Sequence, residues 1–391
     1  MMEFIRTICE EIGPRLGTGD AEKRAGIKIK EMLEGLVDEV FIEPFECHPG
    51  GFLDFLKAAF VAALISVLVF WWVPIASAIL LVYAISTFIV EQMLLKEYTD
   101  FLFPKREGEN VVGKLRPSGE SKQVIIVSGH HDSAYEFPLF AKYKHNFGKL
   151  AYGTAGLMIA GILASVAKFV LDLMSLSSIA SNIALIIFPV AALVLGGYIA
   201  FSLHSKKVIL GANDNLSGVA VVLSLASYFS VNRLVNTELW FVSFSCEECM
   251  RGSKRFVEKH ANELRAARLV NFDMVGRGTI SIDIAEPEYT TKHSKVLARA
   301  FQESSKRAGT ELPMAPTKFG GTDAAFFSKR KIEAISIIGL TPEQYPDTWH
   351  ELTDTPENLK PECLQRALDA TVQFIRDADG GPGDGNETKA L

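Results

Sequence analysis

The sequence has no surplus of positive charge. Its 391 residues carry 40 Lys and Arg side chains against 46 Asp and Glu, which gives a net charge of −6 and a pI of about 5.8. Because binding to a phosphate backbone depends on an excess of basic side chains, a nucleic acid is not expected as a partner. At roughly 150 residues per domain, the length allows two or three folding units.

Cysteine is scarce, and a secretion signal is missing from the sequence given. Five cysteines, an odd number in a long chain, do not form a disulfide framework. Cys246 and Cys249 have the spacing of a redox pair, but the two acids between them disfavour a reactive thiolate, so we expect both to be packing residues. The first 17 residues include early acids and no apolar core of signal-peptide length, which makes a cleaved signal unexpected.

Charge is absent from two long apolar stretches. Ala58–Val90 has no charged residue over 33 positions and is interrupted by Pro74, and Ile179–Leu203 has none over 25. A bilayer core about 30 Å thick needs about 20 helical residues, so these stretches predict helical hairpins in a lipid bilayer. The alternative is a set of core helices buried in a soluble domain or an oligomer interface. The four expected spans are residues 52–73, 75–95, 150–167 and 179–203.

Basic residues near these spans lie on one side of the expected membrane. The far side offers only Lys168, in the link between the third and fourth spans. By the positive-inside rule, the polar segments are expected in the cytosol, where reduced thiols are also at home. The residues on the near side are Lys57, Lys96, Lys105, Arg106, Lys142, Lys144, Lys149, Lys206 and Lys207.

The polar remainder alternates short β-branched runs with helical patterns. This predicts an α/β domain with a mostly parallel mixed sheet covered by helices and interrupted by two transmembrane hairpins. The expected boundaries are 1–49, 97–147 and 206–378 for the three parts of that domain, 50–96 and 148–205 for the hairpins, and 379–391 for a disordered Gly-rich tail.

Polar side chains follow the expected strands at the points where they end. In a parallel sheet these ends meet at one edge, so the side chains there are candidates for a site. Each motif alone has a simpler explanation, as a surface loop, an acidic face, a turn or a helix cap. The candidates are His130 and Asp132 in GHHDS, Asp214 in GANDNLSG, Glu247 and Glu248 in CEEC, Asp273 in NFDMVG, Asp323 in GGTDAAFF, and Trp349 and His350 in WHELTDTPENL.

Imidazole and carboxylate groups without thiolate suit Zn²⁺ in a hydrolytic site, although Co²⁺ and Mn²⁺ also accept such ligands. Two ions can lie about 3.5–4 Å apart when one carboxylate bridges them. Five ligands would then form two three-ligand sites that share one acid, with a second acid left for proton transfer. These five are His130, Asp214, Glu248, Asp273 and His350.

Taken in order, the motifs resemble the co-catalytic di-zinc aminopeptidase family, which includes aminopeptidase S, aminopeptidase Y, glutamate carboxypeptidase and glutaminyl cyclase. GHHDS is similar to the family's AHYDS, GANDNLSG to GADDNASG, and CEECMRGSKRF to GEEEGLLGSRAF. The separation of 84 positions between His130 and Asp214 is long for the family, but 58 of them belong to 148–205. The hairpins therefore look like insertions into a peptidase domain.

The resemblance implies that Asp214 bridges two zinc ions. Glu248 and His350 would complete one site, and His130 with Asp273 the other. Glu247 matches the general base, and Asp132 the residue that orients the His130 imidazole. The implied activity is a membrane-bound aminopeptidase that removes N-terminal residues from peptides.

Three positions depart from the family pattern. His131 replaces the usual Tyr, Ala324 stands where His is common after Asp323, and Trp349 precedes the last ligand. Trp at that place also occurs in the glutaminyl cyclase branch, which uses one zinc ion. The alternatives are therefore a cyclase-like acyltransferase and a non-enzymatic membrane scaffold, and Asp323 and Trp349 are candidates for substrate contact. Oligomeric state and side-chain preference stay open.

Overall fold

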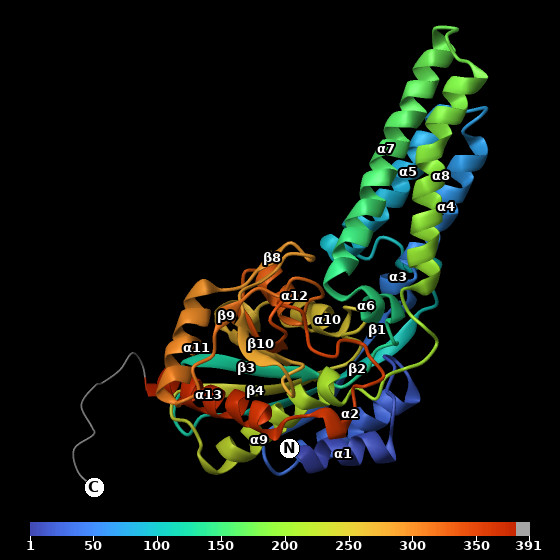
Figure 1. Cartoon of the computed structure of the whole chain (residues 1–391). Helices are drawn as coiled ribbons and strands as arrows, with labels where there is room; N and C mark the ends of the chain where they lie inside the picture. The colour runs from blue at the N-terminus through green and yellow to red at the C-terminus, as the bar shows by residue number, and fades with distance from the viewer. Residues whose placement is uncertain (381–391) are drawn as a thin grey trace. The chain divides into compact units, whose positions relative to one another are not determined.

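The computed structural model describes residues 1–380, which divide into two compact units (Figure 1). The first unit comprises 1–47, 105–136 and 207–380, and the second comprises 48–104 and 137–206. The expected disordered tail lies outside the described residues from 381 onward. Asp379 and Gly380 were predicted in that tail but end a helix, where the Asp379 carboxylate accepts hydrogen bonds from the backbone N–H groups of Val235 and Asn236.

The first unit is built on an eight-stranded sheet with the order β1-β2-β4-β3-β5-β10-β6-β9. The strands are β1 Glu39–Cys47, β2 Arg106–Leu115, β3 Gln123–His130, β4 Thr237–Phe244, β5 Arg268–Asp273, β6 Thr279–Asp283, β9 Met314–Ala315 and β10 Glu333–Leu340. A separate antiparallel pair joins β7 Ala285–Glu286 to β8 Thr291–Lys292.

The four central strands, β4, β3, β5 and β10, are mutually parallel. On one side, β2 runs antiparallel to β4 and to β1; on the other, β6 runs antiparallel to β10 and parallel to β9. Val127 of β3 lies level with Phe241 of β4 and Val270 of β5, and all three side chains are fully buried. Buried β-branched and aromatic residues favour such central strands. The register brings the carboxyl ends of β3, β4 and β5 to one edge.

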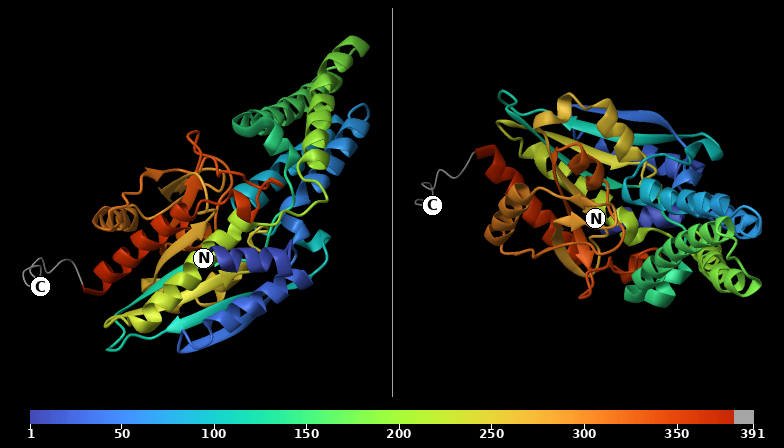
Figure 2. Two further views of the ribbon diagram at one scale, coloured as in Figure 1. Left: turned by 60° about the horizontal axis from the view of Figure 1, so that its bottom comes forward. Right: turned by 90° about the horizontal axis from the view of Figure 1, so that it is seen from above.

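Helices cover both faces of this sheet (Figures 1 and 2). One layer contains α9 against β3, β4 and β5, with α1, α2 and α13 packed on α9, and α11 on α13. The other layer contains α10 and α12, which contact each other. The predicted α/β class is confirmed. The helices are α1 Met2–Glu11, α2 Asp20–Leu33, η4 Ala212–Leu216, α9 Ser217–Val231, α10 Gly252–Lys259, η5 Glu263–Ala266, α11 Lys295–Arg307, α12 Ala324–Lys329, η6 Pro356–Asn358 and α13 Pro361–Gly380.

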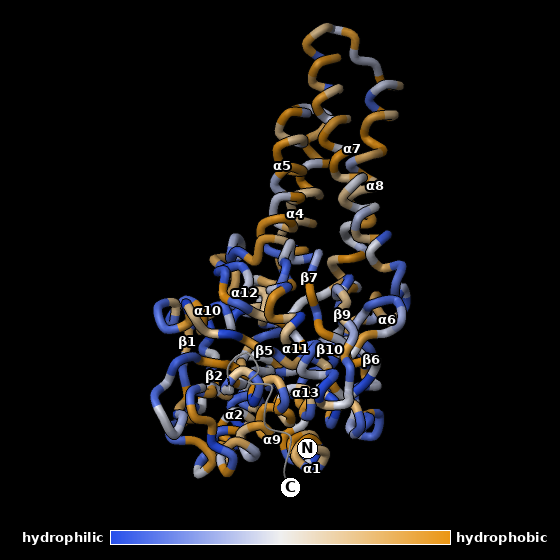
Figure 3. Tube along the Cα trace, turned by 90° about the vertical axis from the view of Figure 1, so that its left-hand side faces the viewer, coloured by the Kyte–Doolittle hydropathy of each residue, from blue (hydrophilic) through white to orange (hydrophobic). Residues whose placement is uncertain are grey.

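The second unit is helical, and its long helices are hydrophobic along most of their length (Figure 3). Pairs α4 and α5, α5 and α7, α7 and α8, and α4 and α8 pack together. Polar groups inside this bundle bond to one another, as in the Ser77 hydroxyl between those of Ser66 and Ser165. The elements are α3 Gly50–Leu53, α4 Phe55–Val69, α5 Pro74–Thr87, η1 Phe88–Met93, η2 Asp100–Leu102, α6 Pro138–Tyr143, η3 Lys144–Asn146, α7 Phe147–Leu173 and α8 Ile179–Ser202.

Four helices among the described residues are long and apolar enough to cross a membrane, and three of them overlap the predicted spans 75–95, 150–167 and 179–203. The four are Pro74–Met93, Pro138–Leu173, Ile179–Ser202 and Ala212–Val231. The predicted first span contains only the 15-residue α4, which is shorter than a full crossing. Ala212–Val231 contains α9, whose side chains are mostly buried against the sheet, so its apolar composition serves the core of the first unit.

Cys246 and Cys249 differ from the prediction as well. They were expected to be packing thiols, and the structure joins them in a disulfide. The residues lie in the tight turn that follows β4, and their Cα atoms are 5.4 Å apart, within the range that a disulfide requires. Cys9, Cys47 and Cys363 are buried free thiols.

Candidate metal centre

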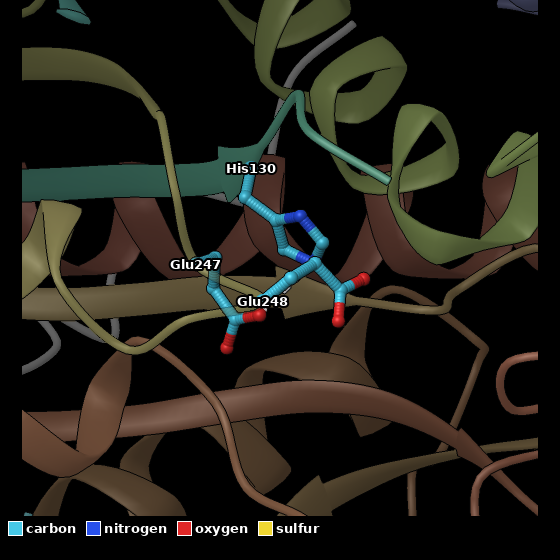
Figure 4. Close-up of side chains that lie close together, drawn as sticks. All are labelled: His130, Glu247 and Glu248. Carbon is cyan, nitrogen blue, oxygen red and sulfur yellow. Dashed lines mark ion pairs between the residues drawn. The ribbon is translucent and has the colours of Figure 1, made fainter. Parts of the chain in front are cut away.

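Three strand ends supply the first part of the site. His130 is the last residue of β3, Asp273 is the last residue of β5, and Glu247 and Glu248 lie in the turn after β4. Figure 4 shows the His130 imidazole directed from the end of β3 toward the Glu247–Glu248 segment. The Nε2 atom of His130 lies 3.6 Å from Oε2 of Glu247 and 4.0 Å from Oδ2 of Asp273.

Asp214 faces two histidines with its two carboxylate oxygens. Its Oδ1 atom lies 3.3 Å from Nε2 of His130, and its Oδ2 atom lies 3.4 Å from Nε2 of His350. The same nitrogen of His350 is 3.0 Å from Oε2 of Glu248. Two sets of three ligand atoms therefore share Asp214, one with His130 and Asp273 and one with Glu248 and His350, and the atoms of each set lie within 4.8 Å of one another.

These distances fit the donor set of a divalent ion. In a tetrahedral zinc site with ligand bonds of about 2.0–2.2 Å, neighbouring ligand atoms lie roughly 3.3–3.5 Å apart. Both His130 nitrogens lack a hydrogen-bond partner among the described residues, as do Oδ2 of Asp214 and Oε1 of Glu247 and of Glu248. Buried polar atoms are rarely left so, and a bound cation would give them a partner.

The electrostatics of the cluster lead to the same conclusion. Burial raises the pKa of Glu247 and of Asp273 well above their ordinary values, and neighbouring carboxylates raise both further. The pKa of Glu248 is raised as well, again mainly by burial. Burial alone would lower the pKa of His130, but Glu247, Asp132 and Asp214 raise it. A divalent cation would stabilise the ionised carboxylates that burial disfavours.

Asp132, predicted to orient the His130 imidazole, lies beside it. Its Oδ1 atom is 3.3 Å from Nδ1 of His130. The hydrogen bonds that Asp132 accepts come from the backbone N–H groups of Glu247 and Glu248, both at 3.1 Å. Asp132 therefore fixes the turn that presents the two glutamates and also lies beside the histidine.

Asp354 positions Asp214 through hydrogen bonds to the backbone. Its carboxylate accepts hydrogen bonds from the backbone N–H groups of Asn213, at 2.6 Å, and of Asp214, at 3.0 Å. Asn215 attaches the same segment to β5, because its side chain donates to the carbonyl of Phe272 and accepts from the N–H of Met274. The sequence analysis missed Asp354, although the DTPEN motif contains it.

Arg15 is a second residue that the sequence analysis missed. Its side chain is fully buried and donates hydrogen bonds to the carbonyls of Gly13, His131, Leu210 and Gly211. Its backbone also exchanges bonds with Ser133. Arg15 therefore joins the loop after His130 to the chain that leads to Asp214. Its only sequence signal is a single arginine between two helices.

His131 occupies the place of the family's usual Tyr. It is fully buried, its Nδ1 atom lies 2.9 Å from the hydroxyl of Ser243, and burial lowers its pKa to about 4. A Cβ atom at Gly26 of α2 would come within 3.3 Å of its Nε2 atom, so this glycine allows the close approach of α2. His131 is a neutral core residue that belongs to none of the ligand groups.

The two candidate substrate contacts lie in different settings. Asp323 is fully buried, and burial raises its pKa to about 7. Trp349 is half-buried, with its ring 6.0 Å from that of Phe319 and 4.7 Å from that of His350. Its edge is 3.2 Å from the position of a Cβ atom at Gly320. Trp349 thus provides an aromatic surface directly beside a ligand histidine.

Residues 196–375 match the family model described as Peptidase family M28. The curated aminopeptidase YwaD from Bacillus subtilis (strain 168) is 29% identical over 175 residues, which are 43% of this chain and 38% of that protein. The chain therefore matches less than half the length of this curated relative. These findings confirm the resemblance that the motifs predict.

Solved structures share the fold across almost the whole chain. A zinc aminopeptidase from Bacillus subtilis gives a TM-score of 0.57 at 14% identity, covering 96% of this chain and 94% of that chain. A glutaminyl cyclase from Bacteroides thetaiotaomicron, bound to N-acetylhistamine, gives 0.57 at 14% identity, covering 96% and 95%. An aminopeptidase from Aneurinibacillus sp. strain AM-1 gives 0.56 at 13%, covering 97% and 94%.

Proposed function

We propose that this chain, whose residues 196–375 match the model of peptidase family M28, is a membrane-bound zinc aminopeptidase. The observation that carries the proposal is the pair of oxygens of Asp214, each of which faces its own histidine. One carboxylate between two three-ligand sets is the arrangement that two adjacent metal ions require. The proposed ligands are His130 and Asp273 on one side of Asp214, and Glu248 and His350 on the other.

Bound zinc would supply Lewis acidity that polarises a scissile carbonyl and lowers the pKa of water. Glu247 is placed to act as the general base, because its Oε2 atom reaches the cluster while its Oε1 atom has no hydrogen-bond partner among the described residues. Its raised pKa suits a group that takes a proton from the attacking water and then gives it to the leaving amine. Asp132 holds the Glu247 backbone in place for this transfer.

The peptidase proposal is tested with a mixture of defined peptides and purified zinc-loaded protein. We expect stepwise loss of N-terminal residues by mass spectrometry. The Glu247→Gln variant should lose 100-fold or more in turnover, as is typical of a general base, while keeping its zinc. Glu258→Gln, at an exposed position of α10, is the matched control and should keep full activity. Full activity in Glu247→Gln would overturn the assignment.

A glutaminyl cyclase-like acyltransferase is the second candidate. Trp349 beside His350 favours it, because an aromatic surface next to the metal could hold the side chain of an N-terminal Gln. In the same peptide mixture, a cyclase would release ammonia from the Gln peptides alone and shorten none. A scaffold without activity would change no peptide.

We also propose that α5 with η1, α7 and α8 cross the membrane, and that α4 does so together with the residues that flank it, 50–54 and 70–73. Large apolar side chains such as Leu68, Trp72, Leu163 and Val194 are more than half exposed, which suits contact with lipid. The basic residues flanking the spans favour a cytosolic peptidase unit, whereas the Cys246–Cys249 disulfide is of a kind more common in oxidising compartments. A protease-accessibility assay on a C-terminal epitope decides this: protection in intact cells supports a cytosolic unit, and cleavage from outside contradicts it.

A further inference from the structure

A second cluster of ligand-type side chains lies outside the centre just described. Asp283 ends β6, Glu286 lies in β7, and His293 directly follows β8. The short β7–β8 pair and a bond from the N–H of His293 to the carbonyl of Ile284 bring the histidine back beside the two acids. One ligand atom from each of the three lies within 4.8 Å of the others.

Each of these side chains uses one polar atom for support and leaves the other without a hydrogen bond. Oδ1 of Asp283 accepts from the N–H groups of Ala285 and Thr317, at 3.0 and 3.1 Å. Oε1 of Glu286 accepts from the N–H and hydroxyl of Thr322, at 2.9 and 2.7 Å. Fixed supporting bonds of this kind are what metal ligands have around them.

The remaining atoms point to a cation. Oδ2 of Asp283, Oε2 of Glu286 and Nε2 of His293 have no hydrogen-bond partner within residues 1–380, and neither does the hydroxyl of the adjacent Thr317. The Nδ1 atom of His293 is held by the Ser328 hydroxyl at 2.8 Å, which directs Nε2 toward Glu286 at 3.3 Å. Asp283 and Glu286 are fully buried, and the His293 side chain is buried as well.

The charge balance supports a divalent ion. No lysine or arginine in the described part of the chain forms an ion pair with Asp283 or Glu286. When both carboxylates are ionised beside a neutral imidazole, the cluster would carry two negative charges that burial makes costly. One divalent ion would neutralise both. A nitrogen and carboxylate oxygens without thiolate suit Zn²⁺ or a similar transition ion.

A second buried histidine shows what a satisfied arrangement of the same groups looks like. His260 also lies between two acids, with Nδ1 3.0 Å from Glu263 and Nε2 2.8 Å from Glu43, so both of its nitrogens have hydrogen-bond partners. Lys259 also pairs with Glu43, at 2.8 Å. His293 lacks both features. Its Nε2 has no hydrogen-bond partner within residues 1–380, and no lysine there forms an ion pair with Asp283 or Glu286, although Lys329 interacts with Glu286 electrostatically.

We infer that Asp283, Glu286 and His293 form a further binding site for a single divalent transition ion, separate from the centre at Asp214. Such an ion would join the β7–β8 pair to the segment that contains Thr317 and Thr322, which leads directly to Asp323. Its role would be structural, and the inference does not depend on the proposed peptidase activity.

The test counts zinc per chain by mass spectrometry of the metal, with Zn²⁺ alone as the probe. In a background of His130→Ala and His350→Ala, which removes the first centre, we expect one zinc ion per chain. Adding His293→Gln should reduce this to none, and adding the matched control His260→Gln should leave it at one. Two results would overturn the site: no zinc in a folded His130→Ala, His350→Ala double variant, or unchanged zinc after His293→Gln is added. Asp283, Glu286 and His293 would then be held together by shared protons and not by an ion.

If the double-alanine background does not fold, the otherwise native chain gives the answer. His293→Gln should lower its zinc content by one ion per chain, and His260→Gln should not change it. Equal zinc in the native chain and in a folded His293→Gln variant would overturn the inference. Activity is not read in either experiment, so failure of the peptidase proposal would be seen separately.

Discussion

The carboxylate of Asp354 accepts a hydrogen bond from the backbone N–H of Asp214 at 3.0 Å. Its other oxygen accepts a hydrogen bond from the N–H of Asn213, so Asp354 binds the backbone of two consecutive residues. The residue that faces two histidines is thus fixed by an acid 140 positions further along the chain. Supporting contacts of this kind commonly change metal affinity 10–100-fold when they are lost.

Asp354→Asn should therefore weaken zinc binding by roughly 10–100-fold, because the amide group keeps one acceptor and presents N–H groups to a second donor. Competition with a coloured chelator measures the affinity. Asp369→Asn, at an exposed position of α13, is the control and should bind zinc as the native chain does. Unchanged affinity in Asp354→Asn would show that Asp214 is held without it.

Arg15→Met should destabilise the first unit by about 3 kcal/mol or more, since four carbonyl groups, two of them buried and two partly buried, would lose their donor. Chemical denaturation gives the free energy of unfolding. Arg307→Met removes an exposed arginine that pairs with Asp377 and should cost less than about 1 kcal/mol. A similar small loss in both variants would contradict the role of Arg15 in joining the loops.

Removal of the metal should make stability depend on pH. The pKa values of Glu247, Glu248 and Asp273 are raised in the folded chain without metal, so above pH 4 the folded state holds more protons than the unfolded state. The stability of chelator-treated protein should consequently fall as the pH rises from about 5 to 8. Melting temperatures of zinc-loaded protein should show less of this fall. The same dependence of melting temperature on pH with and without zinc would show that these buried acids do not destabilise the metal-free protein.

His131 should produce the opposite trend at lower pH. Burial lowers its pKa from 6.5 to about 4, so between these values the unfolded state binds more protons and stability is lost as the pH falls. Each unit is worth about 1.4 kcal/mol, which gives a loss of roughly 3 kcal/mol across the window. Metal-free His131→Gln should lack this component. Equal acid sensitivity in metal-free native and variant protein would show that His131 does not titrate there.

The sequence predicts that the candidate ligands lie together, because zinc chemistry limits the residue types and a parallel sheet gathers strand ends at one edge. His130, Asp273 and the Glu247–Glu248 pair all follow strands, and each can be found from a run of buried residues. The roles of Arg15 and Asp354 could not be predicted, because they depend on backbone groups that only the tertiary structure brings near them.

Hydropathy alone does not distinguish a membrane-spanning helix from a buried core helix in this chain. Ala212–Val231 is apolar enough to cross a membrane, yet it packs against β3, β4 and β5. The interior of a protein and a bilayer select the same side chains, so length and composition alone do not separate these two cases. The Asp283 cluster gave no sequence signal either, because its acids look like ordinary residues at strand ends and turns.

The most direct measurement of the proposed chemistry uses water enriched in the heavy isotope of oxygen. A peptide with Gln at its free N-terminus is incubated with zinc-loaded protein, and the products are weighed by mass spectrometry. Attack by water on the first peptide bond predicts free glutamine with one solvent oxygen in its new carboxylate, and no such product from Glu247→Gln. An unlabelled cyclised peptide, or an unchanged peptide, would contradict the aminopeptidase.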